Sequence, residues 1–311
     1  MADRFALLSY YGLRNIGDEI QSLAARQFLP RVDCHVPREA IDRDPDDPGG
    51  SGEPLKIILN GWFMEDARHW PPSDRLIPHI TSFHITQARR NRGNWWKPKA
   101  KTLLLSPAGR DYLRRHAPIG ARDEATMELL REHGIDAYYS GCLTLTLERP
   151  DGVVRGDDVV ACDLSGRMER AIERRTGKPP LRVTHDVAGM PGVEERFARA
   201  EAMLATYAAA KAVITSRVHC ALPCLAMGTP VLFVPARLER KRQSIAFSLV
   251  RHCREADFLK GRDGFDLADP APNPADHLSM ADALRQSCRA FAGSGGGSGA
   301  QMEAAQDLSG H

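Results

Sequence analysis

Short apolar runs alternate with amphipathic stretches through most of the chain, and this alternation limits the folds that it can adopt. In the first half, strands are expected at 5–10, 55–60, 79–85, 102–106, 119–121 and 137–139, with helices near 16–28 and 123–134. Strands that alternate with helices form parallel sheets with helices on both faces. The pattern therefore predicts a doubly wound α/β fold.

The same alternation begins again after a segment rich in Pro, Gly and charge, ERPDGVVRGDD at 148–158, which reads as a linker. Strands are then expected at 159–164, 181–185, 212–215 and 230–234, with helices at 166–176, 193–210 and 218–227. A chain of 311 residues is long enough for two domains. We expect two Rossmann-like domains, 1–150 and 151–265, that face each other across a cleft, and then a helix and a flexible Gly/Ser-rich tail at 266–311.

Composition narrows the classes of partner and compartment. A formal net charge of +2 is too small to indicate a nucleic-acid partner. Seven cysteines without a C-x-x-C pair indicate a reducing compartment. No apolar run is long enough to span a bilayer, and the start of the sequence lacks the features of a signal peptide. We expect a cytoplasmic protein with no metal site, and the composition indicates no particular oligomeric state.

The stretch VITSRVHCALPCLAMGTPVLFV at 213–234 places Arg217 and His219 where an apolar run ends and a helix begins. In doubly wound sheets, ligands bind beyond the carboxyl ends of the strands, where helix N-termini favour anions. An Arg side chain binds two oxygens of a carboxylate or phosphate, and a His transfers protons near neutral pH. The pair predicts an anion site. The alternative is an Arg paired with a carboxylate and a His that caps a helix.

Two further strand ends carry polar residues. Arg122 follows 119–121, and it either pairs with Asp123 or Glu124 or faces the second domain as another ligand of the anion. An arginine from each half suits a ligand with two anionic groups. Asn15 and Asp18 follow the first strand, and Asp18 is equally well explained as a helix cap or as a base that contacts a sugar hydroxyl.

These motifs together resemble the polysaccharide pyruvyl transferase family over about residues 5–235. The residues that carry the resemblance are N-x-G-D at 15–18, R-D-E at 122–124 with GCLTLTL at 141–147, and ITSRVHCALPCLAMGTP at 214–230. The resemblance implies a GT-B-like fold. It also implies transfer of an enolpyruvyl-derived unit from phosphoenolpyruvate onto two sugar hydroxyls, which makes a cyclic ketal and releases phosphate.

Roles follow from the resemblance by matching motif. It implies donor binding by Arg122, Arg217 and Asn15, and catalysis by His219 and Asp18. The first domain is expected to take the acceptor and the second the donor, with phosphoenolpyruvate as co-substrate and no cofactor. The implied acceptor is a glycan or a lipid-linked glycan of the bacterial exopolysaccharide or cell envelope. A lipid-linked acceptor would bring the protein to the inner face of the membrane.

Acceptor binding has weaker candidates. Trp62, Trp95 and Trp96 offer flat aromatic faces to a sugar ring, although ordinary packing is the preferred explanation for any single Trp. Two other functions remain open at this stage. One is a nucleotide-sugar glycosyltransferase of the same fold, since a fold does not determine a reaction. The other is a sugar- or anion-binding protein without catalytic activity.

Overall fold

The computed structural model describes residues 3–47, 50, 52–63, 67–86, 100–236 and 243–294. The chain forms two compact units. Unit 1 comprises Met1–Tyr11, Ser22–Leu143 and Asp282–His311, and unit 2 comprises Gly12–Gln21 and Thr144–Ala281. The chain therefore passes between the units four times. The loop after the first strand belongs to unit 2, although its neighbours in sequence belong to unit 1.

Unit 1 contains a parallel sheet with the strand order β2-β1-β3-β4-β5-β6. Its strands are β1 (Phe5–Ser9), β2 (Cys34–Pro37), β3 (Leu55–Phe63), β4 (Leu76–Ile85), β5 (Ile119–Ala121) and β6 (Ala137–Tyr139). Helices α2 (Ala100–Leu104), α3 (Pro107–Arg115) and α4 (Glu124–Glu132) belong to this unit, and α1 (Gly17–Arg26) and α10 (Leu278–Gly293) each have residues in both units. Short 3₁₀ turns lie at Arg38–Ala40, Ala67–His69 and Leu143–Thr146.

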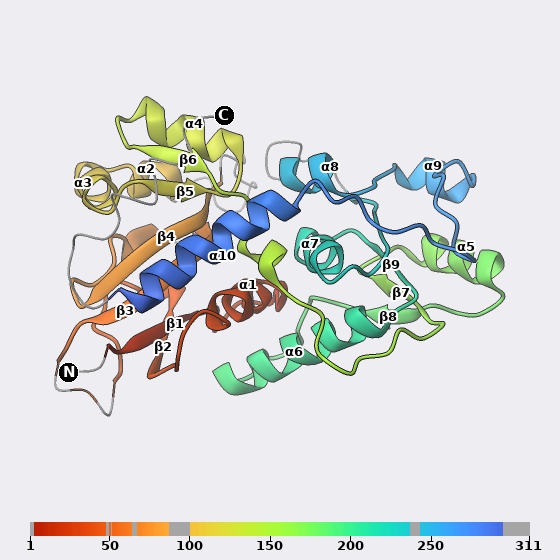
Figure 1. Cartoon of the computed structure of the whole chain (residues 1–311), viewed down its shortest axis with the longest axis horizontal. Coiled ribbons are helices and arrows are strands. Elements are labelled where there is room, and N and C mark those ends of the chain that lie inside the picture. Colours follow the sequence, from red (N-terminus) through yellow and green to blue (C-terminus); the bar gives the residue numbers. More distant parts are fainter. Residues whose placement is uncertain are drawn as a thin grey trace. The chain divides into compact units, whose positions relative to one another are not determined.

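Helix α10 runs along the sheet of unit 1 (Figure 1). On β4, His79 Nε2 lies 2.9 Å from the hydroxyl of Ser287, and its ring stacks on Phe291 with 5.3 Å between centroids. On β3, the ammonium of Lys56 donates to the carbonyl oxygens of Phe291 and Ser294. A cation that binds the last carbonyls of a helix satisfies groups that have no partner within the helix. These contacts hold the end of α10 against the sheet.

Unit 2 contains a second parallel sheet, with the order β10-β9-β7-β8. Its strands are β7 (Val159–Cys162), β8 (Leu181–Val183), β9 (Ala212–Thr215) and β10 (Val231–Phe233). The helices are α5 (Gly166–Thr176), α6 (Val193–Ala209), α7 (Val218–Ala226), α8 (Ser244–Leu249) and α9 (Glu255–Leu259). The central strands β7 and β9 are buried at every residue. A parallel strand covered on both faces requires such a continuous apolar run.

One core of unit 2 lies between its sheet and helices α5 and α9. Alternate residues of β7 and β9, such as Ala161 and Ile214, point into it and meet Met168, Ile172 and Phe258. This alternation follows from the period of two residues in a strand. The packing fixes the carboxyl ends of β7 and β9 beside each other, which is where the candidate site lies.

The predicted alternation of parallel strands and helices is confirmed, but one expected strand is wrong. Residues 102–106 form the end of α2 and a turn, and the N-cap Ser106 and Pro107 then begin α3. A short apolar run does not distinguish a strand from a buried helix. Here Leu104 and Leu105 are buried, but they lie at the end of a helix. Strand β2 was not predicted, because CHVP is short and partly polar. None of the described helices combines the length and the hydropathy required to cross a bilayer.

Candidate functional site

The strand order of unit 2 reverses between β7 and β9. These strands run in register, with Cys162 opposite Thr215, so their carboxyl ends lie side by side. In an open parallel sheet, such a reversal leaves a crevice where ligands bind. Asp163 follows β7, and Arg217 follows β9 after one residue. Unit 2 therefore places a carboxylate and a guanidinium together at its reversal point.

Arg217 and Asp163 form an ion pair. Arg217 Nε lies 2.7 Å from Asp163 Oδ2, and the Arg217 side chain is 42% exposed. Burial works to raise the pKa of Asp163, but hydrogen bonds from Thr184 and His185 and the charge of Arg217 outweigh it and hold that pKa below its usual value. Among the described residues, no group accepts a hydrogen bond from Nη1 or Nη2 of Arg217. One edge of the guanidinium is thus paired, and the other is available to an anion.

The loop before α1 is joined to the segment after β8. Ile16 N donates to His185 O and Val187 N donates to Arg14 O, both at 2.8 Å. The side chains of Arg14 and Asp186 add an exposed ion pair at 2.8 Å. This short antiparallel bridge brings the residues that follow the first strand into unit 2.

Asn15 and Gly17 shape the start of α1. The Asn15 side-chain oxygen accepts a hydrogen bond from Gly17 N at 3.2 Å, as in an Asx turn. A Cβ on Gly17 would lie 2.2 Å from His185 Nδ1, so only glycine fits beside this ring. His185 is itself held by the hydroxyl of Tyr207, 2.9 Å from its Nε2. Donor binding by Asn15 stays a prediction, and the contact that the structure gives its side chain is this one with the start of α1.

Asp18 and His219 meet within unit 2. Asp18 Oδ1 lies 3.6 Å from His219 Nδ1, and the two side chains are 4% and 11% exposed. Each residue is in the first turn of its helix, α1 or α7, and Gln21 Nε2 donates to Asp18 Oδ1 at 3.2 Å. A distance of 3.6 Å is too long for a hydrogen bond but allows electrostatic attraction.

A buried ion pair that the sequence did not predict holds this loop. Arg196 of α6 binds Glu19 with Nε at 2.5 Å and Nη2 at 2.9 Å from the two carboxylate oxygens, and both side chains are 1% exposed. Its Nη1 also donates to the Leu13 carbonyl. Burial raises the pKa of Glu19 even though Arg196 lowers it. The only signal in the sequence was an Arg on the buried face of α6.

Arg122 and Trp62 belong to unit 1. The Arg122 side chain is buried after β5, and the next residue, Asp123, caps α4 through a hydrogen bond from Thr126 N. Burial opposes ionisation of Asp123, but a 2.5 Å contact with His84 and the charge of Arg122 lower its pKa. Trp62 lies in β3, and its ring is 5.4 Å from the guanidinium of Arg38. Trp95 and Trp96 lie outside the described residues.

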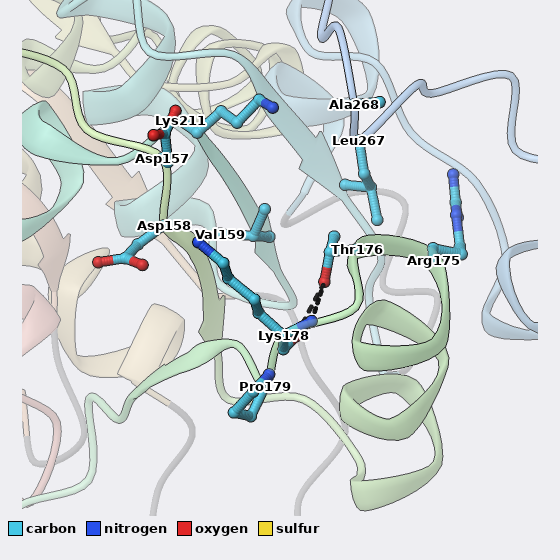
Figure 2. A pocket seen from close by; sticks show the side chains of 10 residues that line it. All are labelled: Asp157, Asp158, Val159, Arg175, Thr176, Lys178, Pro179, Lys211, Leu267 and Ala268. Carbon is cyan, nitrogen blue, oxygen red and sulfur yellow. Dashed lines mark hydrogen bonds between the residues drawn. The ribbon is translucent and has the colours of Figure 1, made fainter.

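A cavity of about 270 Å³ lies at the opposite end of the sheet of unit 2. Asp158 and Lys211, which come directly before β7 and β9, line it together with Asp157 and Lys178 (Figure 2). None of the predicted site residues contributes to its lining. Parallel sheets bind ligands at their carboxyl ends, so we place the candidate site at Asp163 and Arg217 and not in this cavity.

The structure of an uncharacterised protein from Klebsiella pneumoniae is similar with 13% identity and a TM-score of 0.46, over 79% of this chain and 88% of that one. A UDP-N-acetylglucosamine 2-epimerase structure has 12% identity and a TM-score of 0.41, over 94% and 95%. No curated protein sequence matches the chain. The family model of the polysaccharide pyruvyl transferases matches residues 15–235, which is most of the chain and includes Asn15, Asp18, Arg122, Arg217 and His219. The chain therefore belongs to the polysaccharide pyruvyl transferase family.

Proposed function

We propose that this pyruvyl transferase takes its pyruvyl unit from phosphoenolpyruvate and attaches it to two hydroxyls of a glycan as a cyclic ketal, with release of phosphate. The observation that carries the proposal is the arrangement in unit 2. Arg217 presents an unpaired guanidinium edge beside the strand reversal, and His219, two residues further on, lies 3.6 Å from Asp18. An anion site next to a proton-transfer pair is what this reaction requires.

Donor binding depends on charge. Phosphoenolpyruvate carries a carboxylate and a phosphate, and an Arg fork binds either group with two hydrogen bonds. Arg217 supplies one fork from unit 2. The family resemblance assigns the second to Arg122 of unit 1, and this assignment is part of the proposal. In a GT-B-like organisation, unit 2 takes the donor and unit 1 the acceptor, with Trp62 among the candidate contacts of the sugar.

The proposed reaction uses one general acid, His219, and one general base, Asp18. His219 donates a proton to the methylene carbon of the donor, and a sugar hydroxyl adds to the central carbon as Asp18 accepts its proton. The bond from the central carbon to the phosphate oxygen then breaks, and the second hydroxyl adds to the same carbon to close the ketal and gives its proton to the departing phosphate. The proton on Asp18 returns to His219. Overall, one hydroxyl proton ends on the new methyl group and the other on the released phosphate.

The acceptor and the compartment follow from the same proposal. The family acts on polysaccharide, so the hydroxyl pair belongs to a glycan or its precursor. Phosphoenolpyruvate is a cytoplasmic metabolite, so we propose that the protein works in the cytoplasm. Where the acceptor is lipid-linked, the reaction takes place at the inner face of the membrane.

Calorimetric titration separates the competing functions. The protein is titrated with phosphoenolpyruvate and with UDP- and GDP-sugars, and phosphate release is then measured with a panel of glycan acceptors. We expect binding of phosphoenolpyruvate and acceptor-dependent phosphate release. Binding of a nucleotide sugar without phosphoenolpyruvate would instead indicate a glycosyltransferase, and donor binding without turnover would indicate a binding protein.

A matched pair of variants locates the anion. Arg217→Gln removes the guanidinium at the carboxyl end of the sheet, and we expect it to abolish measurable donor binding. Lys178→Gln removes a cation from the cavity at the other end of the same sheet and is expected to leave binding unchanged. The reverse result would move the donor site to the cavity.

A further inference from the structure

We infer that Asp163 is a positioning residue for the donor: it holds the guanidinium of Arg217 by its Nε edge and so presents the Nη edge to the anion. This inference rests on the proposed function, because it assigns a role in binding phosphoenolpyruvate. Asp163 lies outside every motif that predicted the site. It emerges from the structure as the acceptor of the Arg217 Nε hydrogen bond at 2.7 Å.

The carboxylate of Asp163 is oriented by groups other than Arg217. Its Oδ1 accepts a hydrogen bond from the Thr184 hydroxyl at 2.6 Å, and its Oδ2 accepts one from His185 N at 3.0 Å. Both donors belong to the segment after β8. A carboxylate that is held by two hydrogen bonds accepts the Arg217 hydrogen bond in one defined orientation. A freely rotating, exposed acidic side chain would not fix that orientation.

The backbone of Asp163 is held as firmly as its side chain. Its φ of +52° lies in the left-handed region, which residues other than Gly, Asn and Asp rarely adopt. Asp163 N donates to Val183 O at 3.0 Å, and its own carbonyl accepts from the Ser216 hydroxyl at 2.7 Å. Such backbone strain persists where the surroundings over-determine it, and it is frequent at ligand sites.

The consequence concerns the Arg217 side chain. A long, partly exposed arginine samples many rotamers, and ordering it on binding costs conformational entropy. The Nε contact restricts those rotamers before the donor arrives. Because Nε is used, Nη1 and Nη2 lie on the outer edge, where they can bind two oxygens of one carboxylate or phosphate.

The test compares phosphoenolpyruvate affinity by calorimetry in the wild type and in Asp163→Asn. Asparagine has nearly the same size and also tolerates the left-handed backbone, so the variant mainly removes the charge that holds Nε. We expect the Kd for phosphoenolpyruvate to rise by about tenfold, as for loss of a charge-assisted hydrogen bond, with little change in melting temperature. Thr184→Val, which releases the same carboxylate without altering its charge, should shift Kd in the same direction by a smaller factor.

A double-mutant cycle separates positioning from general stability. Lysine has no Nε–H to be held, so in an Arg217→Lys background the Asp163→Asn change should have little further effect on Kd. A purely structural role predicts that the two effects multiply. Glu169→Gln, which removes another carboxylate–arginine pair of unit 2, with Arg182, is the control and should leave Kd unchanged.

The outcomes are distinguishable. If the wild type does not bind phosphoenolpyruvate, the proposed function fails and this inference fails with it. If the wild type binds but Asp163→Asn binds equally well, the inference alone is overturned. Multiplicative effects in the cycle also overturn it, because they show that Asp163 acts without Arg217.

Discussion

His219 Nδ1 lies 3.6 Å from Asp18 Oδ1, and the two residues stand in the first turns of two helices of the same unit. The sequence assigned both to catalysis by resemblance, from motifs far apart in the chain. The structure brings them together because the loop at 12–21 belongs to unit 2. Because they are close together, we expect the two side chains to act together in the proposed reaction.

The first prediction concerns this pair. His219→Gln removes the group that donates a proton, and we expect kcat to fall by about 10²–10⁴ while the protein stays folded. Asp18→Asn removes the base that accepts the hydroxyl proton, so we expect a fall in kcat of similar size. The double variant should be little slower than His219→Gln, since residues that act as a unit are not additive. Near-normal turnover by a folded His219→Gln variant would exclude the proposed role.

The second prediction uses two glycines that each begin a helix. A Cβ at Gly17 would meet His185 Nδ1 at 2.2 Å, so Gly17→Ala must displace the ring or the start of α1. We expect a loss of about 1–3 kcal/mol in stability and a clear fall in kcat, because Asp18 follows directly. Gly166 begins α5, and its nearest contact would be 3.5 Å away, so Gly166→Ala should be neutral or slightly stabilising. Thermal melts and turnover of both variants test the difference.

The third prediction concerns the buried pair of Arg196 and Glu19. Arg196→Met leaves a carboxyl group buried without its cation, and we expect a loss of about 3–5 kcal/mol. Burial already raises the folded-state pKa of Glu19, and loss of the arginine raises it further. A raised carboxyl pKa favours the folded state at low pH and loses that advantage as pH rises through the folded value. The variant should therefore be less destabilised at pH 5 than at pH 8.

Urea unfolding followed by circular dichroism at the two pH values measures this effect. Adding Glu19→Leu to Arg196→Met removes the buried carboxyl group, so stability should recover in part and its extra pH dependence should disappear. An equal loss at both pH values in the single variant would show that Glu19 does not titrate in this range.

The fourth prediction concerns acid unfolding of unit 1. Burial lowers the pKa of His79 from 6.5 to about 4, so the folded state keeps this ring neutral. Because the pKa of His79 is lower in the folded state, the protein has its full stability above pH 6.5. Its stability then decreases as pH falls from 6.5, and the decrease due to His79 ends at about pH 4. The shift corresponds to a loss of up to about 3 kcal/mol. His79→Gln should remove this part of the pH dependence.

The four tryptophans provide the readout, because all of them lie in the span of unit 1. Urea unfolding is followed by tryptophan fluorescence at pH 7.5, 5.5 and 4.5 in the wild type and in His79→Gln. Parallel pH profiles for the two proteins would show that another group causes the acid sensitivity.

The sequence predicted the strand ends well, and the reason is physical. The buried strands β7 and β9 require continuous apolar runs, so a polar residue directly after such a run marks the ligand edge of the sheet. Arg217, His219 and Arg122 were all found by that rule. The same rule did not lead to Asp163, because the strand expected at 159–164 included it, whereas β7 ends at Cys162.

Pairs of residues that are far apart in the sequence could not be predicted from local patterns. Arg196 lies on a helix whose pattern indicates only that one face is buried, and nothing local names Glu19 as its partner. The antiparallel bridge of Asn15 with Asp186 likewise joins segments far apart in the chain. The strand wrongly expected at 102–106 has a different cause, since a run of three leucines suits a buried helix as well as a strand.

Unit 2 is not one continuous segment of the chain, because it includes residues 12–21, so cutting the chain between the units separates parts of unit 2. A recombinant piece that starts at residue 144 would carry Arg217, His219 and Asp163 but would lack Asp18 and the Glu19 carboxylate that neutralises Arg196. Such a piece would expose an unpaired guanidinium and half of a proton-transfer pair. Unit 2 is therefore completed only when two separate stretches of the chain, 12–21 and 144–281, come together during folding.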